Sequence, residues 1–278
     1  MNVLTRGAIE SLGSPLARVV EVHEALDSTQ ERARELARSE MPHGTLVVAK
    51  VQTGGRGRRG RRWGSPVGGL WMSLVLRPDF DASLAPRITQ TAAVGLSKAL
   101  WNFGLEARIK WPNDLLVAGR KVCGILAESG AKHAPAGSPG RPLVGTRRLD
   151  YVVLGVGINV NLDPADLAVP NREVTTVRSE LGRDVDLLQL LRVLLSNLDV
   201  ELRRIEDFGA VLEDWRALNC TLGECVRVTR FGETFDGRAV DLSPEGALLL
   251  ESPRGIVELF EGEIKHLRHG ATGGPVAH

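Results

Sequence analysis

The sequence lacks the features that mark membrane, secreted and disulfide-rich proteins. No apolar run approaches the roughly 20 residues that span a bilayer, and residues 1–15 show neither the basic start nor the apolar core of a signal peptide. Only three cysteines occur, at spacings that match no metal-binding motif, and an odd number does not indicate a disulfide framework. These absences predict a cytoplasmic protein with no membrane segment.

Excess charge and aromatic residues are also scarce. The chain carries 35 Lys and Arg against 34 Asp and Glu, and aromatic residues make up 4% of it. A nucleic-acid-binding protein usually has a broad basic surface, and stacking on single strands needs aromatic side chains. The six histidines form no zinc-binding pair, and neither a G-x-S-x-G elbow nor a Walker A lysine loop occurs. The composition therefore disfavours a general nucleic-acid binder, a zinc enzyme, a serine hydrolase and a P-loop ATPase.

One stretch departs from this even composition, at residues 52–63, with the sequence Q-T-G-G-R-G-R-R-G-R-R-W. Clustered guanidinium groups repel one another unless an anion neutralises them, and the glycines allow backbone N–H groups to approach such a ligand. Taken alone, the composition fits a solvated basic loop or a nucleic-acid tail as well as a ligand site. Apolar strands expected at 45–51 and 70–76 place the stretch inside the domain, where long connections are usually functional or disordered.

Hydrophobic periodicity predicts an α+β protein. A main domain is expected over 19–219, with Leu100 and Trp101 in its core, strands that include 19–24, 45–51, 70–76 and 149–160, and helices at 30–39, 84–103, 186–205 and 208–218. Ser28 and Thr29 precede the first of these helices, where the simplest role for a hydroxyl is to cap it.

The remaining segments are expected to form a small barrel and irregular ends. After residue 219, short alternating strands separated by Gly or Pro turns predict a β-barrel over 220–269, with strands at 225–230, 234–242, 247–251 and 256–260. Residues 1–18 and 270–278 lack periodicity and are expected to be disordered. Residues 130–148 are rich in Ala, Gly, Pro and Arg and are expected to form an exposed insertion.

A second group of polar residues lies near two closely spaced turns. Asn113 and Asp114 follow a strand expected at 108–111, and Lys121 begins the strand that returns from a tight turn at 118–120. An aspartate can hold Mg²⁺ beside cations that receive phosphate oxygens. By spacing alone, simpler roles are favoured for these residues, as turn former for Asp114 and as solvated lysine for Lys121. Asn159, which follows an apolar strand, fits a contact with a base edge or a turn equally well.

A Gly/Arg loop combined with a lysine and an Asn-Asp turn suits a reaction that brings two anions together. Activation of a carboxylate by ATP is such a reaction, because the carboxylate and the α-phosphate repel each other until cations neutralise them. Catalysis would then consist of positioning and electrostatic stabilisation, without a covalent enzyme intermediate.

Five motifs in order along the chain resemble those of biotin protein ligases. They are D-S-T at 27–29, Gln52 followed by G-R-G-R-R-G at 55–60, K-W-P-N-D at 110–114, Lys121 before G-I-L at 124–126, and G-x-G-I-N at 155–159. The resemblance covers roughly residues 19–268. It implies a mixed-sheet catalytic domain of the biotin/lipoate ligase type and an SH3-like C-terminal β-barrel.

The resemblance also implies a two-step reaction. Biotin and MgATP form biotinyl-5′-AMP and pyrophosphate, and the biotinyl group then passes to one lysine of a biotin carboxyl carrier domain. Lys121 and Arg58 are the expected catalytic cations, and Asp114 is the expected ligand of Mg²⁺. The residues implied at biotin are Ser28, Thr29, Gln52, Gly55, Arg56, Gly57, Arg58, Lys121, Gly124 and Leu126. Those implied at ATP or the adenylate are Arg56, Arg58, Trp63, Lys110, Asn113, Lys121 and Asn159.

The resemblance leaves several points open. Gln30 stands where asparagine is usual, and residues 1–18 are too few for the DNA-binding helices of repressor members, so no operator binding is expected. The loop is expected to be a mobile lid in which Arg56 and Arg58 contact ligand while Arg59, Arg61 and Arg62 are solvated. The alternatives are a lipoate or octanoate ligase with the same fold and acyl-transfer logic, and a nucleic-acid-binding module. A homodimer is one of the oligomeric states that the sequence leaves open.

Overall fold

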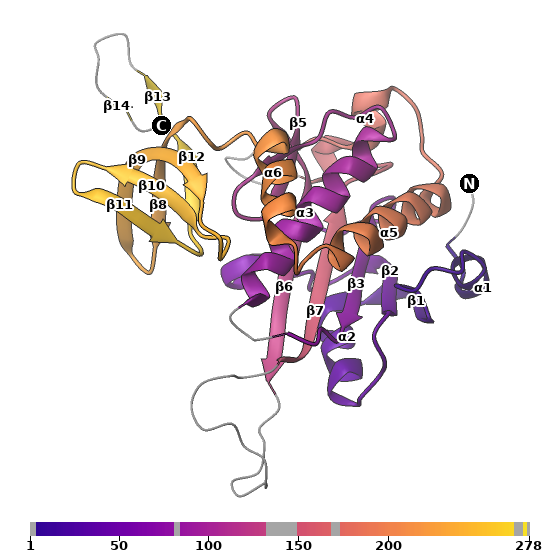
Figure 1. The fold of residues 1–278 in the computed structure, drawn as a ribbon. Coiled ribbons are helices and arrows are strands. Elements are labelled where there is room, and N and C mark those ends of the chain that lie inside the picture. The colour runs from indigo at the N-terminus through magenta and orange to yellow at the C-terminus, as the bar shows by residue number, and fades with distance from the viewer. Residues whose placement is uncertain (1–3, 81–83, 132–148, 168–172, 270–274, 277–278) are drawn as a thin grey trace, which may run out of the picture.

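The computed structural model describes residues 4–80, 84–131, 149–167, 173–269 and 275–276. A seven-stranded mixed sheet forms its centre, with the strand order β1-β2-β3-β7-β6-β5-β4 (Figure 1). Only β1 and β2 pair in parallel, and the other neighbours are antiparallel. The strands are β1 Val19–Leu26, β2 Thr45–Gln52, β3 Leu70–Leu76, β4 Arg108–Lys110, β5 Asp114–Val117, β6 Arg120–Ala131 and β7 Leu149–Ile158.

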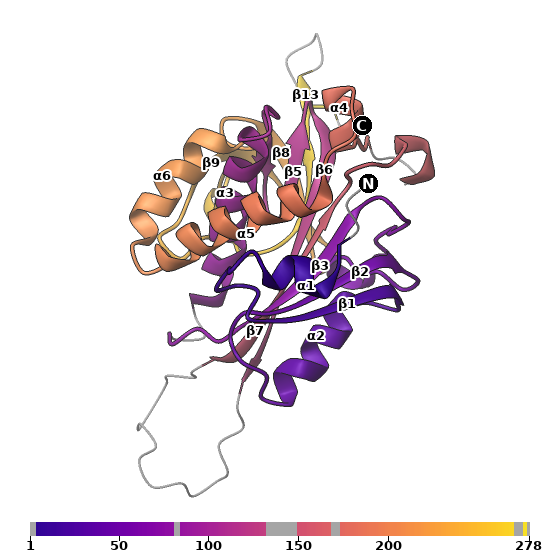
Figure 2. The same cartoon turned by 90° about the vertical axis from the view of Figure 1, so that its right-hand side faces the viewer.

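Helices cover both faces of this sheet, as Figures 1 and 2 show. Side chains at alternate strand positions point to opposite faces. Val47, Val75 and Val153 therefore pack on α2 (Thr29–Arg38), while Leu46, Leu74 and their neighbours join the main core on the other face. That core is completed by α3 (Ala85–Trp101), α5 (Leu187–Arg203) and α6 (Phe208–Leu218), and the short helices elsewhere are η1 (Arg58–Gly60), η3 (Pro164–Leu167) and α4 (Val177–Leu181).

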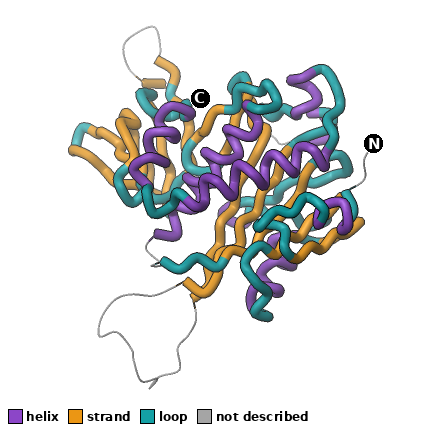
Figure 3. The backbone as a smooth tube through the Cα atoms, turned by 45° about the vertical axis from the view of Figure 1, so that its right-hand side comes forward, coloured by secondary structure: helices purple, strands orange, loops and turns teal. Residues whose placement is uncertain are grey.

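The C-terminal region is an all-β unit, which confirms the predicted change of class after α6. Five antiparallel strands lie in the order β11-β10-β9-β8-β12. They are β8 Cys225–Arg230, β9 Glu233–Leu242, β10 Leu248–Ser252, β11 Gly255–Leu259 and β12 Glu263–His266. The fifth strand, β12, was not predicted, because Lys265 and His266 interrupt its apolar pattern. We call this unit the C-terminal barrel; Figure 3 shows it at one end of the molecule.

The two ends of the chain depart from the expected disorder where they are described. From residue 4 onward the lead-in is ordered: Leu4, Ile9 and Leu16 are buried in the main core, and Thr5 caps the five-residue helix α1 (Arg6–Glu10). The expectation of disorder is therefore wrong for this part, because the three apolar side chains pack on the sheet. In the tail, β14 (Pro275–Val276) pairs with β13 (Arg268–His269). Its other residues, and 132–148 of the expected insertion, lie outside the described residues.

Trp101 is a second correction, whereas Leu100 is buried as expected. Trp101 is 44% exposed because it lies on the outer side of the last turn of α3. Its Nε1 donates to the carbonyl oxygen of Ala107 at 3.0 Å, and the Arg108 guanidinium lies 5.5 Å from the ring centroid. In the part of the chain that the structure describes, we find no helix whose length and hydropathy would allow it to cross a membrane.

His43 gives the fold a pH-dependent contact. Its Nδ1 accepts a hydrogen bond from the backbone N–H of Arg77 at 3.2 Å, and burial, with a smaller contribution from Arg18, holds its pKa below the ordinary value. The folded state therefore binds fewer protons than the unfolded state as the pH falls through about 6.5, so stability is present above that pH and declines below it.

We expect the Tm to fall by a few degrees, on the order of 2–4 °C, between pH 7.5 and 5.5. Differential scanning calorimetry of His43→Asn, which retains an acceptor, should show a shallower slope; an identical slope would contradict this assignment.

Candidate active site

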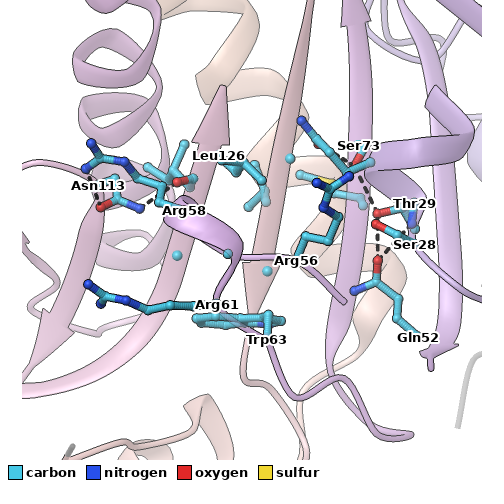
Figure 4. A pocket seen from close by; sticks show the side chains of 18 of the residues that line it. Ser28, Thr29, Gln52, Arg56, Arg58, Arg61, Trp63, Ser73, Asn113 and Leu126 are labelled. Carbon is cyan, nitrogen blue, oxygen red and sulfur yellow. Dashed lines mark hydrogen bonds between the residues drawn. The ribbon is translucent and has the colours of Figure 1, made fainter. Parts of the chain in front are cut away.

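A cavity opens where the N-terminus of α2, the loop 53–69 and strands β3, β6 and β7 meet (Figure 4). The cavity is concave and open to solvent on one side, as sites for small molecules commonly are. The wall combines apolar side chains with hydroxyl, carboxamide, guanidinium and ammonium groups. It brings together most of the residues that the sequence selected. These are Ser28, Thr29, Gln52, Arg56, Gly57, Arg58, Trp63, Asn113, Asp114, Lys121, Gly124 and Leu126.

One end of the cavity carries uncharged polar groups. Gln52 Oε1 accepts hydrogen bonds from the backbone N–H of Thr29 at 2.8 Å and from its hydroxyl at 3.0 Å. Ser28 is the N-cap of α2, yet its side chain caps no N–H group, and its buried Oγ has no hydrogen-bond partner among the described residues. A buried hydroxyl without a partner costs about 1–3 kcal/mol. The simple capping role is therefore wrong for Ser28, and a ligand group can supply the missing partner.

The floor of the cavity depends on glycines in β6 and β7. A Cβ atom at Gly124 would lie 2.9 Å from the Trp63 ring, and one at Gly157 would lie 2.6 Å from Trp63 Nε1. The indole therefore rests on backbone that has no side chains, and Lys121 Nζ lies 4.9 Å from the ring centroid. Trp63 Nε1 is buried with no partner among the described residues. The ring thus offers a stacking face and an unused donor to a ligand.

Arg56 and Arg58 reach the cavity from the loop, as predicted. In Figure 4 Arg56 lies on the side of Thr29 and Arg58 on the side of Asn113. Arg56 is ion-paired with Glu31 of α2. Arg58 Nη1 donates to Asn113 Oδ1 at 3.3 Å, and burial lowers the pKa of Arg58, although a guanidinium remains protonated at neutral pH. Two cations therefore flank the cavity from a single loop.

The three outer arginines of the loop are not merely solvated, which corrects the expectation for them. Arg61 Nη2 lies 2.5 Å from Glu263 Oε2, and Arg59 Nη1 donates to the carbonyl oxygen of Thr229 at 3.1 Å. Both partners belong to the C-terminal barrel, whereas Arg62 Nη2 donates to the carbonyl oxygen of Thr53 within the loop at 2.7 Å. The barrel thus holds the outer side of the loop, a contact that sequence spacing could not show.

The Arg61–Glu263 pair allows a direct test of this contact. Both side chains are about 40% exposed, and exposed ion pairs contribute about 0.2–1 kcal/mol. We expect Arg61→Ala and Glu263→Ala each to weaken ligand binding by less than about fivefold, with the double variant no weaker than either single variant. Binding titrations of the three variants would measure this coupling. Additive losses would show that the two residues act separately.

Lys121, Asp114 and Asn113 stand together at the other end of the cavity, beside Arg58. Lys121 Nζ is ion-paired with Asp114 Oδ1, and only 11% of the lysine side chain is exposed. Asn113 Nδ2 donates to the carbonyl oxygen of Ile125 at 2.7 Å, which fixes the carboxamide. The turn-former role of Asp114 and the solvated role of Lys121 are therefore wrong. The pair places an ammonium group and a carboxylate together in the cavity wall.

The residues present fit a Mg²⁺ ion that arrives with its substrate better than one held by protein alone. No group of three His, Cys, Asp or Glu side chains within the described ranges could hold a metal ion. Mg²⁺ commonly binds one or two carboxylates together with substrate phosphates. Asp114 can provide one such oxygen after it leaves Lys121.

Three predicted residues do not reach the cavity wall. Gly55 packs inside the loop, where a Cβ atom would lie 2.5 Å from the carbonyl oxygen of Trp63. Asn159 is buried, and its Nδ2 donates to the carbonyl oxygen of Thr175 at 3.0 Å. Lys110 lies on β4 opposite Asp114 in the strand register but outside the cavity lining. Their proposed ligand contacts remain predictions.

Several wall residues were not among the predicted ones, and some had a signal in the sequence. Ser73 is the single polar residue of the apolar strand β3, and Gly155 and Gly157 interrupt β7. The only sequence signal at Gln30 is its departure from the usual asparagine. No sequence signal marks the other additions, which are Arg61, Arg62, Met72, Ile125 and Val156.

Known protein families and proteins are similar to this chain in sequence. Residues 22–136 match the model of the Biotin/lipoate A/B protein ligase family, and residues 221–267 match that of the Biotin protein ligase C terminal domain. The Bifunctional ligase/repressor BirA of Bacillus subtilis (strain 168) is 36% identical over 87% of this chain and 72% of its own. The Biotin--[acetyl-CoA-carboxylase] ligase of Paracoccus denitrificans is 33% identical over 82% of this chain and 92% of its own.

A solved structure has a fold similar to that of this chain. It is the biotin protein ligase from Aquifex aeolicus in complex with biotin and ATP, which is 29% identical, covers 91% of this chain and 100% of its own, and superposes with a TM-score of 0.71. The α+β class, with a mixed-sheet domain followed by a small all-β domain, is confirmed by these matches. The chain belongs to the biotin protein ligase family.

Proposed function

We propose that this protein is an ATP-dependent biotin protein ligase that modifies a biotin carboxyl carrier domain. The observation that supports this most strongly is the division of the cavity. Ser28, Thr29 and Gln52 supply hydrogen-bonding groups at one end, with Arg56 beside them, while Arg58, Lys121 and Asp114 lie at the other (Figure 4). Biotin has the same polarity, with a ureido ring at one end and a carboxylate at the other. Relatives are named as biotin–[acetyl-CoA-carboxylase] ligases.

The first step joins the biotin carboxylate to ATP. A carboxylate oxygen attacks the α-phosphorus, the bond to the bridging oxygen breaks, and pyrophosphate leaves as biotinyl-5′-AMP forms. Arg56, Arg58 and Lys121 lower the barrier because they offset the repulsion between two anions and the charge that develops at phosphorus. Lys121 is the principal catalytic cation in this proposal. Mg²⁺, when bound with ATP, would neutralise phosphate charge, and Asp114 is the carboxylate that would contact it.

The second step transfers the biotinyl group to the carrier domain. The neutral amine of one carrier lysine attacks the acyl carbon, the acyl–phosphate bond breaks, AMP leaves, and the lysine nitrogen loses a proton. The cations that held the phosphate in the first step stabilise the leaving AMP in the second. Trp63 offers a stacking surface for the adenine. Gly124 and Leu126 line the part of the cavity in which the aliphatic chain of biotin would lie. The three free cysteines, of which Cys123 is buried, suit the reducing cytoplasm that we also propose as the location.

Release of pyrophosphate in the absence of carrier protein tests the first step. With purified protein, ATP and Mg²⁺, we expect pyrophosphate release only when biotin is added. Lipoate and octanoate, assayed side by side at the same concentration, serve as controls because the family model also covers lipoate ligases. Release with lipoate equal to that with biotin would assign the chain to the lipoate branch, and no release with biotin would remove the proposal.

A further inference from the structure

The polar end of the cavity is backed by a chain of three buried side chains. Thr29 Oγ1 lies 2.9 Å from Ser73 Oγ, and Ser73 Oγ donates to Gln30 Oε1 at 3.1 Å. Each of these residues is at most 3% exposed. Ser73 and Gly155 are register partners on β3 and β7, and a Cβ atom at Gly155 would lie 2.4 Å from Gln30 Oε1. The glycine therefore leaves the room in which the longer glutamine side chain lies.

The orientation of the Gln30 carboxamide follows from its other partners. Its Nε2 donates to Glu128 Oε2 at 3.0 Å and to the carbonyl oxygen of Val153 at 3.1 Å. Both partners are acceptors, and Glu128 Oε2 also accepts a hydrogen bond from Arg34 Nη2 at 2.5 Å. A flipped amide would place Oε1 against two other oxygens, so the network assigns the orientation. Gln30 Oε1 must therefore face Ser73 as an acceptor.

The hydrogen-bond network of Gln52, Thr29, Ser73 and Gln30 contains one acceptor oxygen that receives no proton from the network. The links Gln52–Thr29, Thr29–Ser73 and Ser73–Gln30 need three hydroxyl protons, but the two hydroxyl groups supply only two. Because Ser73 gives its proton to Gln30, it has none for Thr29. Thr29 donates its own proton either to Gln52 or to Ser73, and in both cases its oxygen receives no proton from these neighbours. When Thr29 donates to Gln52, both lone pairs of Gln52 Oε1 are used, so the Thr29 hydroxyl oxygen is the acceptor that is left unfilled in either case.

We propose that Gln30 is a positioning residue that fixes the direction of the Ser73 proton and thereby makes this end of the cavity selective for a ligand with an N–H donor. The proposal rests on the function proposed above, in which the ureido ring of biotin lies at Thr29 and Gln52. A ureido ring carries two N–H groups, whereas the dithiolane of lipoate carries none. A site built around unpaired acceptors rejects a ligand that lacks the matching donor, because the buried acceptors are then left unsatisfied.

A double-variant cycle distinguishes proton direction from simple packing. In Gln30→Met the Ser73 proton loses its acceptor and turns toward Thr29, so the affinity for biotin is expected to fall at least about tenfold. Ser73→Ala removes that proton and is expected to cost less than about threefold. In Gln30→Met/Ser73→Ala no proton can turn toward Thr29, so most of the affinity should return. Gln90→Met is the matched control, because Gln90 is also 3% exposed but lies outside this cavity.

Isothermal titration calorimetry with biotin, and with an analogue whose two ureido N–H groups are replaced by oxygen, provides the measurement. The wild-type protein should discriminate strongly between these ligands, Gln30→Met should do so weakly, and the double variant should regain discrimination. Additive losses, or an equal loss for both ligands, would reduce Gln30 to a packing role. If Gln30→Met does not fold, Thr29→Val tests the same acceptor, and unchanged discrimination in that variant would overturn the inference. Failure of the wild-type protein to bind biotin would instead refute the proposed function.

Discussion

Replacing Lys121 with alanine is expected to slow the formation of biotinyl-5′-AMP by at least about a hundredfold, the loss typical of one preorganised electrostatic group. The ammonium group of Lys121 is enclosed by the cavity wall, and only 11% of the lysine side chain is exposed. Enclosure strengthens its interaction with a developing phosphate charge, because water screens it less. The Km for biotin should change less than kcat, since the charge at phosphorus grows mainly in the transition state.

Lys110→Ala is the matched control for this prediction. Lys110 carries the same charge on the neighbouring strand β4, is half-buried and lies outside the cavity lining, so we expect a change of less than about threefold. Single-turnover formation of the adenylate would measure both variants, and circular dichroism would check that each is folded. Equal losses in the two variants would support the contact between Lys110 and the triphosphate that the sequence predicts. An unchanged rate in Lys121→Ala would remove Lys121 from the mechanism.

Arg58→Ala should cause a second large loss, again at least about a hundredfold in adenylate formation. Arg58 points toward the same end of the cavity as Lys121. Its Nη1 donates a hydrogen bond to Asn113 Oδ1, and its Nη2 lies 3.7 Å from Oε2 of Glu261 in the C-terminal barrel. A guanidinium can bind two oxygens of a phosphate or carboxylate at once. Arg58→Lys should recover only part of the rate, because an ammonium group cannot make this paired contact.

Arg59→Ala is the control for Arg58, since it removes the same charge from the adjacent position of the same loop. Arg59 contacts the barrel and does not line the cavity. We expect it to retain at least about a third of the wild-type rate. If Arg59→Ala were as slow as Arg58→Ala, the general charge of the loop, rather than the contact made by one guanidinium, would account for the effect.

The three cations that are proposed to meet the ligand are each matched to a protein carboxylate in this structure. Arg56 pairs with Glu31, Lys121 with Asp114, and Arg58 approaches Glu261. This pairing explains how the Gly/Arg loop tolerates its own charge. It also means that an incoming carboxylate or phosphate must exchange with a carboxylate already present, so ligand affinity reflects a difference between two ion pairs.

Local sequence signals were sufficient to predict the main strands and the position of the Gly/Arg loop. Strand β3 begins and ends where its apolar run predicts, and β2 differs from its predicted end by one residue. The match is close because both strands are buried in the sheet, so apolar pattern and structure agree. The order of the five motifs then identified most of the cavity wall.

Contacts between distant parts of the chain could not be predicted in the same way. The approach of Glu263 to Arg61 depends on how the barrel packs against the main domain, and no local pattern encodes that. The exposure of Trp101 depends on which side of α3 faces its neighbours. Gln30 departs from the usual asparagine, but its proposed role depends on contacts with Ser73, Gly155 and Glu128, which are distant from it in the sequence.

Transfer of biotin to a carrier domain would test the proposed ligase activity most directly. Purified protein, ATP and Mg²⁺ would be incubated with a biotin carboxyl carrier domain and either biotin or lipoate, and the product would be examined by intact-protein and peptide mass spectrometry. We expect a single biotinyl group on one lysine of the carrier domain, dependent on ATP, and no lipoyl product at the same concentration. Absence of biotinylation by the folded protein, or lipoylation at an equal rate, would contradict it.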